Sequence, residues 1–481
     1  MRRAWNAVFL VFGGLSLGAV VTLSAAQVST SSPTAVSFGK NIRISGDDPN
    51  GLNQNETAIA VNPNDPTSLV AVFQERVTRS RPLNCLFAFS TNSGRTWTLG
   101  GRGPLEKSGD FCFDPSIAAD AAGNFYFSYI DADLTVPGSD FDLVVARSTD
   151  GGRTFATFSI AADNVPGDST TPHPDKDVVT ADTQPGSPFR GSLYLGYTNL
   201  TFSGDEVSVV VSGNAGTTWS TPTVIARQDK HDKADKSRFG ALPVIAADGS
   251  VYLFYSEFPS SFGTGPLSIR FARSTDGGLT WTVPADVASG LPSPGFFRLK
   301  NADPQFGVVP ETGLAGLTLP AAAVAPDGAL YVSWVDFPQG ACTLDGSDDP
   351  PCTNADVRLS VSRDGGTTWT LPVKVSDETN ATDQFLPWIA THPDGRLSLV
   401  WQDRRLDASN VNYDTFYTNT LDGATFLPNV RVTSASSPLG TVNFIGDYNG
   451  LAVTADSIFP VWTDTRFGTP DVFVVRGQLR P

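Results

Sequence analysis

An octapeptide of the form Ser-x-Asp/Asn-x-Gly-x-Thr-Trp/Phe recurs along this chain of 481 residues. Five copies match the pattern fully, and a shortened sixth copy follows them. The five begin at Ser90, Ser148, Ser212, Ser274 and Ser362, and the sixth runs from Thr420 to Phe426. Most copies lie roughly sixty residues apart. A repeat on that scale predicts a propeller or another array of repeated units.

The residue types of the octapeptide are those of a tight turn between two strands. An Asp or Asn side chain bonds the nearby backbone, and Gly supplies a positive φ angle without steric cost. The closing Trp or Phe re-enters a packed sheet, where its large apolar ring is buried. The octapeptide therefore predicts structure rather than chemistry.

Each repeat carries the same series of strand patterns, as the second one illustrates. An inner strand is expected near 115–120, a second, aromatic-rich strand at 125–130 and a third at 143–147, which leads into the octapeptide and a fourth strand. Strands joined in this way form a four-stranded antiparallel blade. The same series recurs at 57–97, 178–219, 243–281, 321–369 and 387–426.

A seventh repeat lacks the octapeptide and stops after its third strand. Its strand patterns lie at 450–453, 459–462 and 471–475, whereas residues 41–45 resemble the fourth strands at 373–376 and 430–433. We therefore predict an all-β propeller, a single domain over 41–481, whose N-terminal strand completes the last of seven blades. Closing the ring removes an exposed sheet edge. Six blades is the alternative.

The N-terminus has the pattern of a targeting segment. Arg2 and Arg3 precede an apolar run over 4–23, and small residues at 24–26 offer a cleavage site. This predicts a signal peptide over 1–26, a short segment over 27–40 and a secreted or extracytoplasmic protein. An uncleaved membrane anchor is the alternative, because the run approaches the length that spans a bilayer. No membrane span is expected in the mature chain.

Four cysteines in an exported chain predict two disulfides. The local pairing is Cys85 with Cys112 and Cys342 with Cys352. A zinc site is not expected, because the three histidines are scattered and no Cys-x-x-Cys occurs.

Two loops are rich in aspartate. One carries Asp345, Asp348 and Asp349, and the other carries Asp131, Asp133, Asp140 and Asp142. Oxygen ligands of this kind suit calcium, although no EF-hand spacing is present, and solvated acidic loops are the alternative. No cofactor is predicted beyond this structural calcium.

The formal net charge of −16 argues against a nucleic-acid partner. A chain that binds a phosphate backbone needs clustered Lys and Arg to neutralise it, and no such cluster is present. The acidic balance is explained by solubility.

A second repeat lies at the end of each second strand, where an aromatic residue is followed two positions later by an acid or Asn. The pairs are Phe73/Glu75, Tyr129/Asp131, Tyr197/Asn199, Tyr255/Glu257, Trp334/Asp336, Trp401/Asp403 and Trp462/Asp464. Strand alternation places both members on one face. Because second strands end where inner strands begin, these acids are predicted to ring one mouth of the central channel. The alternative is that each acid bonds loop amides of its own blade.

Three blades that follow one another around the closed ring add an arginine to this acid. They carry Glu75-Arg76, Asp403-Arg404 and, two residues after Asp464, Arg466. Arginine suits a two-point grip on a carboxylate. With Asp447 and Tyr448 entering the seventh blade on the same face, this sector is predicted to bind an anionic sugar. Pairing of Asp with Arg inside each blade is the alternative.

The octapeptide is similar to the Asp-box, the bacterial neuraminidase repeat, and the chain resembles sialidase-type propellers over nearly its whole mature length. The segment Tyr448-Asn449-Gly450-Leu451 resembles the element that carries the sialidase nucleophile. The resemblance implies Tyr448 as nucleophile, with Asp447, Asp403 or Asp464 in proton transfer. It also implies that Arg76, Arg404, Arg466 and Glu75 hold the substrate. Glu56 and Glu257 are candidates for the glutamate that activates the tyrosine.

The chain departs from that family in the first blade. Where sialidases carry an arginine in the inner strand, this sequence reads Asn55-Glu56-Thr57, and residues 77–84 contain no acid to serve as proton donor. Three functions are therefore compatible with the sequence. The chain acts as a sialidase-like glycoside hydrolase on anionic glycans, as a non-catalytic propeller that binds glycans or a protein partner, or as a hydrolase of neutral polysaccharides.

Overall fold

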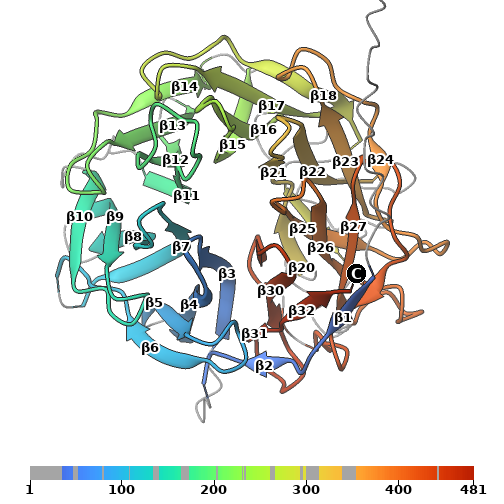
Figure 1. Ribbon diagram of the computed structural model, residues 1–481. Coiled ribbons are helices and arrows are strands. Elements are labelled where there is room, and N and C mark those ends of the chain that lie inside the picture. The colour runs from blue at the N-terminus through green and yellow to red at the C-terminus, as the bar shows by residue number, and fades with distance from the viewer. Residues whose placement is uncertain are drawn as a thin grey trace, which may run out of the picture. The chain divides into compact units, whose positions relative to one another are not determined.

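The computed structural model consists of β-strands arranged as seven blades in a ring (Figure 1). It describes residues 35–46, 53–78, 81–107, 109–133, 140–163, 173–201, 204–229, 231, 235–259, 266–292, 296–299, 314–337, 354–440, 442 and 444–480. Within these residues no helix is present, and none could therefore span a membrane. The predicted signal peptide over 1–26 lies outside them and stays a prediction.

Each blade is a sheet of four antiparallel strands, taken from the channel outward. Blade 1 contains β3 (Asn53–Asn62), β4 (Asp65–Thr78), β5 (Arg81–Ser90) and β6 (Thr98–Arg102). Blade 2 contains β7 (Phe111–Ala119), β8 (Phe125–Asp133), β9 (Asp140–Ser148) and β10 (Thr157–Ala162). Blade 3 contains β11 (His173–Ala181), β12 (Leu193–Leu200), β13 (Asp205–Ser212) and β14 (Thr223–Arg227).

Blade 4 contains β15 (Lys236–Ile245), β16 (Val251–Pro259), β17 (Leu267–Ser274) and β18 (Ala285–Leu291). Blade 5 contains β21 (Ala321–Val324), β22 (Leu330–Asp336), β23 (Asp356–Ser362) and β24 (Val373–Lys374). Blade 6 contains β25 (Gln384–Thr391), β26 (Leu397–Asp403), β27 (Asp414–Thr420) and β28 (Val430–Arg431). A separate hairpin of β19 (Phe296–Leu299) and β20 (Leu314–Leu317) lies in the chain between blades 4 and 5.

Blade 7 is closed by the N-terminal segment, as the sequence predicts. It contains β29 (Gly450–Val453), β30 (Ser457–Asp464) and β31 (Asp471–Val474), and its fourth strand is β2 (Ile42–Arg43). Ile42 pairs with Val474 in β31, and the Ile44 N–H donates to the Val472 carbonyl at 2.9 Å. A further pair, β1 (Val36–Phe38) with β32 (Gly477–Leu479), extends the same sheet. In Figure 1 β2 runs beside β31 and β1 beside β32.

The octapeptides form the turns that their residue types predict. In the third of them, the Gly216 N–H donates to Ser212 Oγ at 3.0 Å and the Thr218 N–H donates to Asn214 Oδ1 at 3.0 Å. In the fourth, hydrogen bonds from the hydroxyl and N–H of Thr280 hold the pKa of Asp276 at about 2. The Asp and Asn side chains of the octapeptides are thus hydrogen-bonded within their own turns. These turns lie at the end of the channel opposite the start of the inner strands.

The hydrophobic core lies between neighbouring blades. Trp401 of blade 6, for example, packs with Tyr331 and Val361 of blade 5, and Trp334 of blade 5 packs with Phe254 of blade 4. The rings of Trp334, Trp401 and Trp462 are fully buried. Burial of large aromatic rings of this kind contributes much of the stability of a core. Because the blades share their cores, residues at the channel are held by the whole ring.

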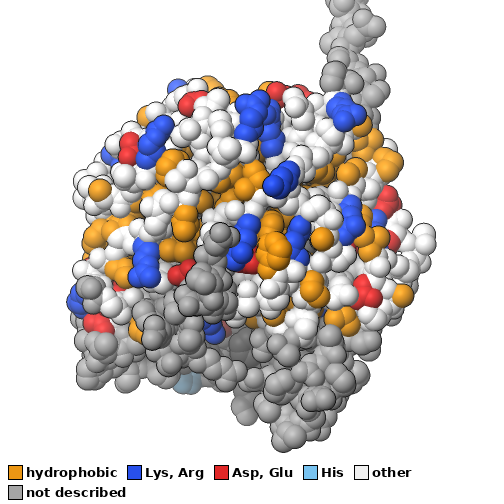
Figure 2. Space-filling model, turned by 90° about the horizontal axis from the view of Figure 1, so that it is seen from below, with side chains coloured by type: hydrophobic (Ala, Val, Ile, Leu, Met, Phe, Trp, Pro, Cys, Tyr) orange, Lys and Arg blue, Asp and Glu red, His pale blue; other side chains and the backbone are white. Residues whose placement is uncertain are grey.

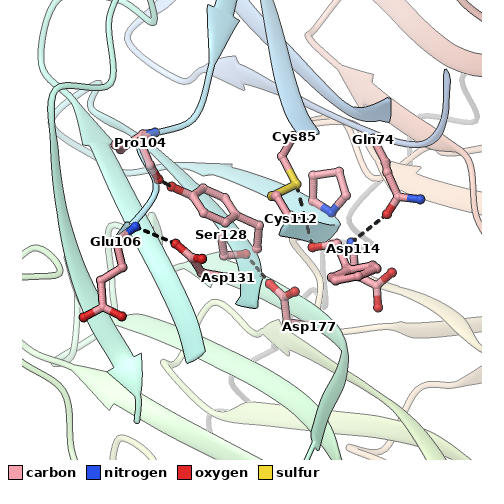
Figure 3. The surroundings of a disulfide bond; sticks show 12 residues. Gln74, Cys85, Pro104, Glu106, Cys112, Asp114, Ser128, Asp131 and Asp177 are labelled. Atoms are coloured by element: carbon pink, nitrogen blue, oxygen red, sulfur yellow. Dashed lines mark hydrogen bonds between the residues drawn. A yellow bond between two sulfur atoms is a disulfide. The ribbon is translucent and has the colours of Figure 1, made fainter. Parts of the chain in front are cut away.

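A disulfide joins blades 1 and 2, which confirms the predicted pairing of Cys85 with Cys112. Cys85 lies on β5 and Cys112 at the start of β7, so that the bond fixes the segment that leads to Asp114 (Figure 3). The predicted pair Cys342–Cys352 lies outside the described residues.

We expect the double variant Cys85→Ala/Cys112→Ala to lose about 3–4 kcal/mol of unfolding free energy, because the bond closes a loop of 27 residues in the unfolded chain. Urea denaturation of the oxidised proteins measures the difference. A loss below about 1 kcal/mol would show that the bond adds little to the packing between blades 1 and 2.

On the face shown in Figure 2, Lys and Arg side chains lie in small separate groups among hydrophobic and uncharged residues. This face has no continuous basic strip of the kind that binds a phosphate backbone.

Candidate active site

The inner strands share an irregularity near their start, at one end of the channel. The register of pairing shifts near the beginning of β3, β7, β11, β15 and β25. Inside each shift lies a residue with positive φ, namely Glu56 (55°), Asp114 (52°), Lys176 (49°), Gly240 (80°) and Leu386 (50°). Such a backbone costs a residue with a side chain about 1–2 kcal/mol. Strain repeated in this way points to a functional position.

These residues occupy one equivalent position in every blade, which we call the ring position. It lies two residues before the point at which regular pairing with the second strand begins or, after a register shift, resumes. Glu56 thus precedes Ala58, and Tyr448 precedes Gly450. From blade 1 to blade 7 it is held by Glu56, Asp114, Lys176, Gly240, Leu319, Leu386 and Tyr448. Blades 7, 1, 2 and 3 thus contribute polar groups side by side, whereas blades 4 to 6 contribute Gly and Leu.

Tyr448 reaches across the channel from blade 7 to blade 2. Its side chain is buried, and its hydroxyl donates to the Pro115 carbonyl at 3.4 Å. From blade 3, the Lys176 ammonium lies 3.3 Å from the centre of the Tyr448 ring. A cation over an aromatic face is attracted by the ring, and the attraction strengthens away from water. Side chains far apart in sequence thus meet at one end of the channel.

Carboxyl groups surround this pair, and Asp114 lies at their centre. The protonated carboxyl groups of Glu56 and Asp175 can each donate a hydrogen bond to it, and its Oδ2 accepts the Lys176 backbone N–H at 2.8 Å. Asp177 accepts a hydrogen bond from Ser128 Oγ at 2.6 Å, and Figure 3 shows both of these residues near Asp114. We call Glu56, Asp114, Asp175, Asp177 and Asp447 the carboxyl cluster.

Burial and the charges of neighbouring carboxylates raise the proton affinity of four of these groups. Burial first, and the Asp114 charge second, raise the pKa of Glu56 and of Asp175 well above their usual values. The same causes bring the pKa of Asp447 to about 7, and burial brings that of Asp177 to about 8. Burial also lowers the pKa of Lys176 and, with the nearby carboxylates, raises the pKa of Tyr448. Shifts of this kind are typical of catalytic sites.

Asp447 is the member of the cluster best placed to exchange a proton with a bound molecule. Its side chain is partly exposed, as are those of Asp114 and Asp175, whereas Glu56 and Asp177 are buried. The Leu317 N–H at the end of β20 donates to its carboxyl group. A carboxyl group with a pKa of about 7 is protonated in about half of the molecules at neutral pH, so that it can act as a general acid.

A cavity of about 330 Å³ lies along the channel and is bounded at one end by Lys176 and Tyr448. Inner-strand residues of all seven blades line it, and Lys176 and Tyr448 are among its lining residues. Most of the remaining lining is apolar, for example Ile59, Val178 and Trp388. Lys176 and Tyr448 therefore lie between the cavity and the carboxyl cluster.

The aromatic-x-acid repeat serves mainly to hold loops. The Trp401 indole N–H donates to Asp403 at 2.7 Å, and the Trp462 indole N–H donates to Asp464 at 2.9 Å, which confirms that each pair shares a face. Both acids are fully buried, and each also pairs with an arginine of its own blade: Asp403 with Arg405 at 2.7 Å and Asp464 with Arg466 at 2.6 Å. These contacts correspond to the alternative interpretation of the repeat.

The predicted arginine group does not contact Tyr448 among the described residues. Arg404 is fully buried and pairs with Asp383 at 3.2 Å, whereas Arg76 is exposed. Glu75 accepts a hydrogen bond from Asn84 at 3.2 Å. These contacts do not support a grip on a sugar carboxylate, and the substrate-binding roles of these residues and of Arg466 stay predictions.

Of the two glutamates proposed to activate the tyrosine, Glu56 is the one beside it. Burial raises the pKa of Tyr448, and the nearby Glu56 charge raises it further. Glu257 instead pairs with Arg238 at 3.2 Å and with Arg270 at 3.1 Å on the sheet of blade 4.

The aspartate-rich loop of blade 2 is occupied by protein groups. The Lys107 ammonium lies 3.2 Å from Asp133 and 3.8 Å from Asp140, and the Glu106 N–H donates to Asp131 at 2.7 Å. In the described part of the chain, no group of three or more His, Cys, Asp or Glu side chains is arranged to hold a metal ion. Asp345, Asp348 and Asp349 lie outside that part, and structural calcium stays a prediction.

Sequence reasoning placed Tyr448 and Asp447 in the site but missed Asp114, Asp175, Lys176 and Asp177. A signal for them was present. When the starts of the inner strands are aligned, the triplets Asn55-Glu56-Thr57, Phe113-Asp114-Pro115, Asp175-Lys176-Asp177 and Asp447-Tyr448-Asn449 fall at the same place. Polar residues there are unexpected in strands that line a packed channel.

We expect Gly446→Ala to disturb this site and to destabilise the fold by about 1–3 kcal/mol. Gly446 has a φ of +91°, and a Cβ at this position would lie 2.7 Å from the Glu56 backbone nitrogen. Thermal unfolding measures the loss. Gly468→Ala is the matched control, because Gly468 also has a positive φ (+96°) but has nothing within 4 Å of its Cβ position. Equal losses in both variants would mean that contact with Glu56 adds nothing.

The seven blades define a β-propeller whose octapeptide turns are similar to the Asp-box. Residues 203–304 match the model of the BNR repeat-like domain family, which confirms the resemblance seen in the repeats. No curated protein sequence matches this chain significantly.

Three solved structures to which this chain is similar are described as enzymes that act on carbohydrates. An ulvan lyase of polysaccharide lyase family PL25 aligns with a TM-score of 0.52 and 9% identity over 90% of this chain and 95% of its own. An alpha-L-arabinofuranosidase from Fusarium graminearum aligns with a TM-score of 0.46 and 12% identity over 76% and 92%. A Hadza microbial sialidase aligns with a TM-score of 0.45 and 14% identity over 92% and 94%. The ulvan lyase, whose TM-score lies above 0.5, shares the fold of this chain, and at 9% identity the likeness establishes nothing beyond the fold.

Proposed function

We propose that this chain is a glycan-acting propeller, and specifically a glycoside hydrolase whose acid is Asp447. The observation that carries the proposal is the carboxyl cluster at the ring position, where partly exposed carboxyl groups of raised proton affinity lie beside Asp114. Glycoside hydrolysis needs one carboxylic acid to protonate the leaving oxygen and a second carboxylate as base or nucleophile. Asp114 is the candidate for the second role.

A neutral glycan is the substrate class that the charges favour. Lys176 is the one cationic group facing the carboxyl cluster, and any ionised member of the cluster would repel a sugar that carries its own carboxylate. The arginine fork that such a sugar needs is not supported by the contacts of Arg404 and Arg466. The proposed substrate is therefore a neutral polysaccharide or oligosaccharide.

Hydrolysis of a sialoside is the second candidate, and one observation favours it. Glu56 lies beside Tyr448, as an activating base would lie beside a tyrosine nucleophile. A tyrosine is suited to a substrate whose carboxylate would repel an anionic nucleophile.

Fluorogenic glycosides of arabinose, xylose, glucose, galactose and N-acetylneuraminic acid test both candidates on the purified protein. We expect hydrolysis of a neutral glycoside that Asp447→Asn and Asp114→Asn abolish. Hydrolysis of the sialoside alone, lost in Tyr448→Phe, would support the second candidate instead. No hydrolysis, together with binding on a glycan array, would overturn the enzyme proposal and favour a binding propeller.

We also propose that the protein is exported through the predicted signal peptide. A disulfide between Cys85 and Cys112 supports an oxidising compartment. Mass spectrometry of the protein recovered outside the cytoplasm tests the proposal, with Gln27 as the expected first residue. A chain that retains residues 1–26 in the membrane fraction would show an uncleaved anchor.

A further inference from the structure

Lys176 is an unusual residue for its position. Its side chain is 6% exposed, and its backbone has a φ of 49°, which favours glycine. Lysine is rarely buried to this extent unless it is paired, and the left-handed backbone adds a further cost. In the equivalent position of blade 4 the chain carries Gly240, which avoids that cost. A buried, strained lysine among these blades calls for a role that outweighs both penalties.

The contacts of Lys176 involve four blades. Its ammonium lies 3.3 Å from the centre of the Tyr448 ring, and its backbone N–H donates to Asp114 Oδ2 at 2.8 Å. The charged and titratable groups that face it are Glu56 from β3, Asp114 from β7, Asp175 and Asp177 from its own strand β11, and Asp447 and Tyr448 from the segment before β29. Of these groups, Lys176 is the only one that carries positive charge.

We propose that Lys176 is the positioning residue of this site, with its ammonium over Tyr448 holding the ring across the channel and balancing the carboxyl cluster. The consequence for catalysis rests on the proposed function, whereas the structural role does not. Glu56, Asp175, Asp177 and Asp447 all have proton affinities that the Lys176 charge lowers, so the same side chain acts on every one of them.

The pH dependence of stability tests the structural role without any substrate. A carboxyl group whose pKa is higher in the folded protein than in the unfolded chain favours the folded state below the unfolded pKa. That contribution is lost as the pH rises from about 4, the ordinary carboxyl pKa, through the folded values of about 7 and 8 for Asp447 and Asp177. Without the Lys176 charge, these folded values rise further and the loss becomes larger.

The experiment compares the melting temperatures of four proteins at pH 5 and pH 8. The variants are Lys176→Met, which removes the charge at similar length, and Lys176→Arg, which keeps it. Leu386→Met is the matched control, because Leu386 holds the ring position of blade 6 with a φ of 50° and is also buried. We expect the drop in melting temperature from pH 5 to pH 8 to be larger in Lys176→Met than in the other three proteins. Equal drops in all four would overturn the proposal.

A double variant keeps the test valid if Lys176→Met does not fold. Adding Asp114→Asn removes one carboxylate together with the ammonium, so the charge balance is restored in part. We expect Lys176→Met/Asp114→Asn to be more stable at pH 8 than Lys176→Met alone, because residues that interact are not additive. A double variant that is less stable than Lys176→Met, or that also fails to fold where Lys176→Met does not fold, would show that charge balance is not what Lys176 provides.

Activity separates this proposal from the proposed function. If a glycoside is hydrolysed, the pH above which kcat/KM falls should move upward by about 1 unit or more in Lys176→Met and return in Lys176→Arg. An unmoved pH limit, with kcat lowered equally in both variants, would overturn the positioning role. Absence of turnover in the parent protein, with the stability result as expected, would refute the proposed function and support the role of Lys176.

Discussion

Replacement of Asp447 by asparagine is expected to lower kcat on a glycoside substrate by a factor of about 10²–10⁴, the usual contribution of a general acid. Asparagine has nearly the same size, and its amide oxygen can still accept the Leu317 N–H, so the fold should be retained. The variant removes the proton that the leaving oxygen needs. Steady-state kinetics on the glycoside that the parent protein hydrolyses measures kcat. The melting temperature, measured in parallel, shows whether the variant is folded.

The pH profile adds a second measurement for the same variant. A general acid must be protonated, so the activity of the parent protein should be full below the Asp447 pKa of about 7 and decline above it. In Asp447→Asn this decline should disappear, while the residual rate stays low. Asp403→Asn is the informative comparison, because Asp403 is fully buried against Trp401 and Arg405. If Asp403→Asn lost kcat and Asp447→Asn did not, the acid would have been assigned to the wrong residue.

The fold could be predicted because its information is local and repeated. Each octapeptide reports on its own turn, as the hydrogen bonds from the Gly216 and Thr218 N–H groups to Ser212 and Asn214 show. The alternation that placed Trp401 and Asp403 on one face needs only the geometry of a strand. Even the long-range closure by Ile42 followed from counting strands, since one blade lacked its fourth.

The candidate site was only partly predictable because it depends on backbone irregularities. The bulge near the start of five inner strands turns one side chain out of the ordinary alternation, and no single repeat shows this in its sequence. The contact of Tyr448 with Pro115 joins residues 333 positions apart, through the curvature of the ring. Of the arginines predicted to bind an anionic sugar, Arg404 pairs with Asp383, and Arg466 pairs with Asp464 two residues away in the same short loop.

The acids after the second strands and the polar residues of the ring position therefore have different roles. The acids after the second strands accept hydrogen bonds from Trp indoles and Arg side chains, so they hold the loops around the mouth. The residues at the start of the inner strands face one another across the channel, and there the polar side chains are confined to four neighbouring blades. An asymmetric set of side chains on a symmetric frame is what a site for one ligand requires.

Removal of residues 35–46 is expected to cost more than about 5 kcal/mol of unfolding free energy. The truncation exposes the cavity left by Ile44, which is 3% exposed in the intact protein, and loss of a buried Ile is worth about 2–5 kcal/mol. It also removes Arg43, whose guanidinium lies 2.6 Å from the fully buried Asp471. A buried carboxylate that loses its partner costs about 3–5 kcal/mol more. Denaturant unfolding of the truncated protein measures the sum.

A synthetic peptide of residues 36–46 provides the control, because a strand added in trans can complete an open sheet edge. We expect the peptide to restore the melting temperature of the truncated protein, and a peptide with Ile44→Asp not to do so. Since blade 7 also carries Asp447 and Tyr448 at its inner edge, loss of its outer strand should loosen the site as well. A truncated protein with the stability of the intact one would mean that the ring closes without β2, and that the packing of β29 and β30 against β3 suffices to hold blade 7.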